Sequence, residues 1–68
     1  MMKATPNLIE REIDALATDP YRVVRAVEVY RLIRDSYDDA DFATKAQLDR
    51  LTSRLYAEGF GISLEESV

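Results

Sequence analysis

The sequence contains no cysteine, no histidine and no tryptophan among its 68 residues. The absence of cysteine excludes a disulfide framework, and the absence of both cysteine and histidine excludes structural zinc of the usual kind. A single core in so short a chain rarely supplies more than ~3–5 kcal/mol, so domains of this size need a further source of stability. Oligomerisation, a partner chain or very good helix packing remain as sources.

The same absences bear on catalysis. Without histidine and cysteine, the chain lacks the commonest general base and the commonest thiol nucleophile. The acidic segment 35–41 does not fit a calcium loop, because such a loop needs glycine at its sixth position and glutamate at its twelfth. We therefore expect a protein that is not an enzyme, with no catalytic residues, no metal, no cofactor and no small-molecule substrate.

Long apolar runs are also missing. No run approaches the ~18 residues of a membrane-spanning helix, and the start, "MMKATPNLIEREID", has no apolar stretch of the kind found in secretion signals. Because the lack of cysteine fits a reducing compartment, we expect a cytoplasmic protein without a membrane contact. The net charge of −4 argues against non-specific binding to nucleic acid or to anionic lipid.

What is present predicts an all-α fold, a small three-helix domain. The expected helices lie at about 6–17, 20–36 and 43–58, so residues 1–61 form a single helical domain, followed by a short irregular and flexible C-terminal tail over 62–68. A strand over 21–33 is the alternative for the middle segment. It is disfavoured because neither the odd nor the even positions are uniformly apolar, whereas apolar residues recur at helical spacing.

Capping residues mark the expected helix starts. Thr5 and Asp19 each precede a proline, and a proline in the first helical turn has no amide to leave unpaired. The third helix has two possible caps, either Asp41 or a capping box that Thr44 forms with Gln47. At its end, glycine at 59 followed by phenylalanine at 60 has the spacing of a Schellman motif, in which Phe60 packs back on Leu55.

The middle segment, "YRVVRAVEVYRLIRDSY" at 21–37, has more apolar side chains than one amphipathic stripe needs. The stripe that we expect to face the core consists of Val23, Ala26, Val27, Tyr30, Ile33 and Tyr37. Val29 and Leu32 lie outside that arc, next to Arg22 and Arg25. They predict a second apolar face on this helix.

Two interpretations of the second face stay open. Either the first helix covers Val29 and Leu32 within one chain, or another chain covers them, most simply a second copy across a two-fold axis. We favour the second, because the third helix offers only a narrow apolar seam, which leaves little to cover them. That seam consists of Leu48, Leu51 and Leu55, helped by Phe42 and Phe60. We therefore predict a homodimer or a complex with a protein partner. The predicted function is a small non-enzymatic interaction or regulatory module whose contact residues are Val29, Leu32 and Arg25, with Arg22 at the rim.

A second hypothesis concerns the segment "TKAQLDRLTSRLYAEGFGIS" at 44–63. A helix that ends in glycine and an aromatic residue resembles the recognition helix and wing entry of winged-helix DNA-binding proteins. This resemblance implies a DNA-binding regulator whose contacts come from Lys45, Gln47, Arg50, Ser53 and Arg54. The alternative is an ordinary surface helix with i, i+4 ion pairs, Lys45–Asp49 and Arg54–Glu58. Nucleic acid therefore ranks below a protein as the expected partner.

Overall fold

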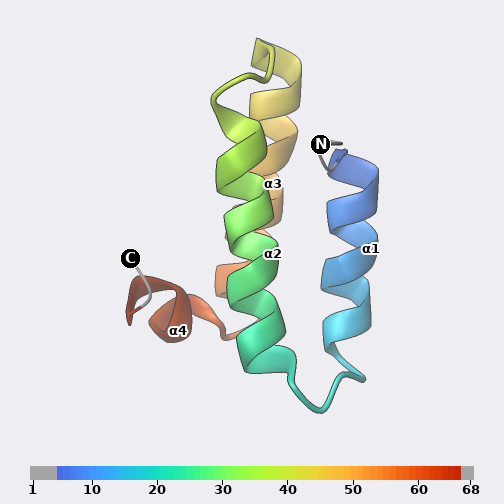
Figure 1. Ribbon diagram of the computed structural model, residues 1–68, viewed down its shortest axis with the longest axis vertical. Coiled ribbons are helices and arrows are strands. Elements are labelled where there is room, and N and C mark those ends of the chain that lie inside the picture. The colour runs from blue at the N-terminus through green and yellow to red at the C-terminus, as the bar shows by residue number, and fades with distance from the viewer. Residues whose placement is uncertain (1–4, 67–68) are drawn as a thin grey trace.

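The computed structural model describes residues 5–66, and this part of the chain is all-α, as predicted. Its elements are α1 (Pro6–Leu16), α2 (Arg22–Tyr37), α3 (Phe42–Ala57) and α4 (Gly61–Glu66). The three longer helices run up and down in alternation, and the short α4 lies beside the first half of α2 (Figure 1). Each of the three longer helices packs on the other two, while α4 packs on α2 and α3.

The helix starts follow the capping chemistry. The Thr5 hydroxyl accepts a hydrogen bond from the Leu8 amide at 3.2 Å, as predicted for α1. At α3 the cap is Asp41, whose carboxylate accepts from the Thr44 amide at 2.8 Å, so the capping box starting at Thr44 is wrong. The Thr44 hydrogen bonds lower the pKa of Asp41, since they stabilise its ionised form.

The second helix begins two residues later than predicted. The Asp19 carboxylate accepts a hydrogen bond from the Tyr21 amide at 2.8 Å, which makes a turn rather than a helix cap. The Arg22 amide then donates to the Asp19 carbonyl at 3.2 Å. Because these hydrogen bonds form a turn, α2 starts at Arg22. It ends at Tyr37, one residue later than expected.

The end of α3 is the predicted Schellman motif. Gly59 has a φ of 97°, its amide donates to the Tyr56 carbonyl at 3.1 Å, and the Phe60 amide donates to the Leu55 carbonyl at 3.2 Å. The irregular tail predicted for 62–68 is wrong as far as Glu66, because α4 follows at once and Leu64 is completely buried. Residues 67 and 68 lie outside the described part of the chain.

One apolar core holds the helices together. Every described helix contributes to it, and its buried apolar members are Ile9, Ile13, Leu16, Ala26, Val29, Ile33, Leu48, Leu51, Leu55, Phe60 and Leu64. The residues from α3 are the three leucines expected on its narrow seam. Phe42, which was expected to help that seam, is 90% exposed at the first turn of α3. The core therefore includes Leu64 of α4 and leaves Phe42 out.

Candidate functional site

The buried side of α2 differs in part from the predicted one: Ala26 and Ile33 are buried as expected, but Val29 and Val23 exchange roles. Val29 is 1% exposed and belongs to the core, whereas Val23, expected in the core, is 51% exposed. The buried seam runs through Ala26, Val29 and Ile33 and ends at the buried Ser36. Spacings of three and four residues place these side chains on one side of the helix. Val29 is therefore wrong as a contact residue for a partner, because its own chain encloses it.

The other three predicted contact residues, Leu32, Arg25 and Arg22, lie at the surface. Leu32 is 39% exposed. Arg25 joins α1 to α2, because its guanidinium lies 3.4 Å from the Glu12 carboxylate and 3.1 Å from the Glu28 carboxylate. The second of these ion pairs has i, i+3 spacing on α2. Arg22, one helical turn before Arg25, lines a separate pocket described below.

The flank of α2 towards α3 and α4 carries four further apolar residues. Val27, Tyr30 and Tyr37 are each half-buried and pack against the core from its edge. Together with Val23 they recur at spacings of three, four and seven residues, which is one side of a helix. These four residues, Val23, Val27, Tyr30 and Tyr37, form what we call the outer apolar face of α2.

Part of this face borders an opening between α2 and α3, which we call the tyrosine pocket. It has a volume of about 340 Å³, and its lining consists of Tyr30, Ile33, Arg34, Tyr37, Asp38, Asp49 and Thr52. Ile33 belongs to the buried core and so forms the floor. Aromatic and aliphatic surface below a charged rim is the usual composition of a contact site for another molecule.

Hydrogen bonds and cation–π contacts fix the two tyrosines. The Arg34 guanidinium donates to the Tyr30 hydroxyl at 3.1 Å and lies 5.8 Å from the centre of that ring. The hydroxyl raises the pKa of Arg34, so this side chain stays charged. On the other side, Lys45 Nζ lies 5.2 Å from the centre of the Tyr37 ring, and the Tyr37 hydroxyl is 3.5 Å from Asp49 Oδ2. Both rings are thus held at the pocket with their cations beside them.

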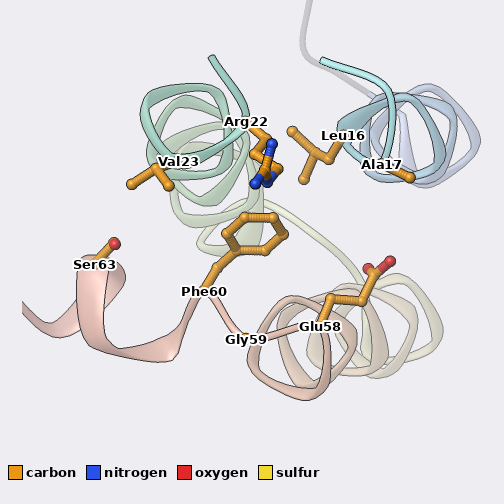
Figure 2. Close-up of a pocket in the computed structure, with 8 residues that line it drawn as sticks. All are labelled: Leu16, Ala17, Arg22, Val23, Glu58, Gly59, Phe60 and Ser63. Carbon is orange, nitrogen blue, oxygen red and sulfur yellow. The ribbon is translucent and has the colours of Figure 1, made fainter. Parts of the chain in front are cut away.

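A second pocket, the end pocket, lies where the end of α1 meets the start of α2. It has a volume of about 400 Å³, and its lining consists of Leu16, Ala17, Arg22, Val23, Glu58, Gly59, Phe60 and Ser63. Figure 2 shows Arg22, Leu16 and Phe60 pointing towards one another across it, with Val23 and Ser63 facing each other at one side. Leu16 and Phe60 are core residues, so the floor of this pocket is the closed end of the core.

The residues predicted to contact DNA are not brought onto one surface of α3. Arg54 turns towards α1, where it forms ion pairs with Asp14 and with Glu58, the latter at 3.5 Å as predicted. Gln47 lies with Arg50 at a pocket between α1 and α3. Lys45 is on the opposite side, over Tyr37 instead of paired with Asp49, and Ser53 is exposed. An α3 surface that presents all five to one groove of DNA is therefore absent from the described residues.

Sequence reasoning missed Phe42 as a surface residue. It was assigned to the core because large apolar side chains are usually buried. The signal that could have placed it outside is its position directly after Asp41: with Asp41 as the cap, the core-facing leucines 48, 51 and 55 lie on the far side of α3 from residue 42. Phe42 is the most exposed of the large apolar side chains in the described chain.

Residues 5–66 contain no group of three or more acidic side chains that could hold a metal ion. In the same range, every buried side-chain nitrogen and oxygen has a hydrogen-bond partner. No helix of this part of the chain is long and apolar enough to span a membrane. The polar atoms that a ligand can reach are therefore those on the exposed rims of the pockets.

The fold and the pockets define a small all-α helical protein with an aromatic surface opening between two of its helices. Comparisons with protein-family models, with curated proteins and with solved structures found no match to this chain.

Proposed function

We propose that this chain is a small non-enzymatic interaction module that self-associates through the outer apolar face of α2. The observation that carries the proposal is the tyrosine pocket, an opening of about 340 Å³ that Tyr30 and Tyr37 line above Ile33. Burying the exposed part of such side chains against a partner contributes up to ~1.5–3 kcal/mol for each large one. Tyrosine and arginine are also the residue types that most often dominate protein interfaces.

The occupant is a second copy of the chain, because the lining of the pocket carries charges of both signs. Arg34 supplies a positive charge, and Asp38 and Asp49 supply negative charges. A two-fold axis places each positive group of one copy near the negative groups of the other, so the same surface is complementary to itself. A surface of one sign would instead repel its copy.

Size supports the same conclusion. The core of one chain has eleven buried apolar residues, while eight large apolar side chains remain exposed in the described part. A small domain that has neither disulfides nor zinc gains stability by burying such side chains in a dimer. The lack of cysteine also fits a reducing compartment such as the cytoplasm, which is where we propose that the dimer forms.

The test uses two charge reversals on the same helix. Arg34→Glu places a third acid at the tyrosine pocket and breaks the bond to Tyr30, so we expect it to convert the dimer to a folded monomer. Arg31→Glu is the matched control, because Arg31 is equally a surface arginine of α2 but does not line the pocket. Light scattering measures the mass, and far-UV circular dichroism confirms that both variants stay helical.

Two results contradict the proposal. The first is a wild-type chain that remains monomeric at high micromolar concentration. The second is a dimer that the two charge reversals weaken equally, because the contact would then not lie at the tyrosine pocket.

A further inference from the structure

Phe42 is a large apolar side chain that is left uncovered within residues 5–66. It is 90% exposed at the first helical position of α3, directly after the cap residue Asp41. A helix start held in place by a cap presents this ring in a defined position. Water-exposed aromatic surface is also the kind of surface whose burial drives association.

Phe42 lies on the same side of α3 as the rim of the tyrosine pocket. It precedes Asp49, a residue of that rim, by seven residues, which is close to two full helical turns. The two side chains therefore project from α3 in nearly the same direction, about 10 Å apart along the helix axis. The ring stands next to the pocket of its own chain and stays outside it.

We infer that in the dimer the Phe42 ring of each copy inserts into the tyrosine pocket of the other copy. This inference rests on the proposed function, since it names the side chain that fills the proposed contact site. An exposed ring and an open pocket on one chain, both on the same side of α3, form a self-complementary pair when a two-fold axis passes between them. The site is then incomplete in a single chain, and the partner copy contributes the missing residue.

The geometry of the pocket suits an aromatic ring. Its volume of about 340 Å³ exceeds what a single phenyl side chain fills, and Ile33 forms an apolar floor. Tyr30 and Tyr37 line it, so an inserted ring meets two aromatic partners and can adopt the offset or edge-to-face arrangement that such pairs prefer. The exposed rim then closes over the inserted side chain.

Charges next to the ring match charges next to the pocket. Asp41 directly precedes Phe42, and Asp39 lies two residues earlier in the same exposed loop. The cations beside the pocket are Arg34 and Lys45, which lie over the two tyrosine rings. The pocket lining also includes Asp38 and Asp49, so the insertion is favoured in the register that places the acids of one copy next to Arg34 and Lys45 of the other. These ionic contacts make the association sensitive to salt.

The first experiment measures the dimer dissociation constant of Phe42→Ala by sedimentation equilibrium. Because the side chain is 90% exposed in the single chain, its removal should leave the monomer folded and equally stable while it weakens the dimer at least roughly tenfold. Tyr21→Ala is the matched control, since Tyr21 is a similarly exposed aromatic residue, 76% exposed, outside the tyrosine pocket. We expect it to leave the dissociation constant unchanged.

The second experiment locates the ring directly. The chain has no cysteine, so two single-cysteine variants, Phe42→Cys and Thr52→Cys, can be mixed and oxidised with no competing thiol. Thr52 lines the tyrosine pocket. We expect the mixed disulfide between the two variants, mixed in equal amounts, to exceed each symmetric disulfide by clearly more than the about twofold excess that random pairing gives. The reason is that the thiol that replaces Phe42 enters the pocket of the other copy.

The outcomes separate this inference from the proposed function. If Arg34→Glu gives a monomer and Phe42→Ala dimerises like the wild type, the pocket is the contact site and the insertion of Phe42 is wrong. If neither variant affects a dimeric wild type, both proposals are wrong. A monomeric wild-type chain also refutes both, and loss of the dimer in both variants with a predominant mixed disulfide supports both.

Discussion

Replacing Gly61 by alanine tests how closely α4 approaches α3. A Cβ atom at Gly61 would lie 2.6 Å from Cδ1 and 3.0 Å from Cε1 of Tyr56. Atoms do not pack that closely, so the Tyr56 ring must rotate away or α4 must shift. Overpacking of this kind typically costs about 1–3 kcal/mol. For a chain of this length, each kcal/mol lowers the melting temperature by about 4–8 °C.

The Tyr56 ring is what a Cβ atom at position 61 would clash with, so removing this ring should abolish the destabilisation by Gly61→Ala. In a Tyr56→Ala background the new methyl group meets no ring, and glycine to alanine within a helix then stabilises by about 0.4–1 kcal/mol through the unfolded state. The double-mutant cycle should therefore show a coupling energy of about 1–4 kcal/mol between the two positions. Urea unfolding followed by circular dichroism at 222 nm measures all four chains.

Gly59 provides the control, because the other glycine is needed for a different reason. A Cβ atom there meets nothing within 4 Å, but the φ of 97° is a conformation that L-residues adopt at a cost of about 1–2 kcal/mol. Gly59→Ala should thus destabilise the chain equally with and without the Tyr56 ring. If Gly61→Ala also costs the same in both backgrounds, the steric reasoning about α4 is refuted.

Three further predictions follow from the caps, the core and the surface. Asp41 has a lowered pKa, so its contribution to stability is present above about pH 4 and is lost as the pH falls through its folded pKa. Asp41→Asn should therefore flatten the acid limb of a plot of urea midpoint against pH. An unchanged limb would speak against this cap. Val29→Ser should lower the free energy of unfolding by at least about 1–3 kcal/mol, since it buries a hydroxyl in the core. Leu32→Ser should change it by no more than about 0.5 kcal/mol. Equal losses in thermal unfolding would show that the two faces are misassigned. Gel-shift assays on mixed genomic fragments at ~50 mM salt should show no complex, and a shift that weakens steeply with salt would revive the DNA hypothesis.

The helix boundaries could be predicted because they depend on local chemistry. Thr5 before a proline and Gly59 before Phe60 each place hydrogen bonds within a few residues of themselves, and the structure has those bonds. The start of α2 was misplaced by two residues for the same kind of reason. Asp19 can cap a helix or close a turn with nearly the same bond, and the turn is what forms.

The choice of the buried face on α2 could not be predicted in the same way. Two apolar stripes overlap on this helix, and both contain Ala26 and Ile33. Which stripe is buried depends on where α1 and α3 lie, and that is decided by the whole core at once. Ser36 follows Ala26, Val29 and Ile33 at the same helical spacing and is buried with them. Because serine is usually exposed, its position on this side of the helix does not indicate burial.

The tyrosine pocket and the exposed ring of Phe42 could not be predicted from the sequence, for a related reason. The tyrosine pocket joins side chains of α2 and α3 that are up to 22 positions apart in the sequence, from Tyr30 to Thr52. Their juxtaposition requires the crossing of the two helices, which no local pattern specifies. Phe42 was misread because hydrophobicity alone favours burial, and only the register that Asp41 imposes on α3 turns it outward.

The tyrosines also give the chain an optical property. With no tryptophan present, its near-ultraviolet emission comes from four tyrosines, and two of them line the pocket between α2 and α3. Shielding of those two phenols from solvent would alter intensity and quenching by iodide without any attached dye. The native chain is therefore its own fluorescent reporter of whether that pocket is filled.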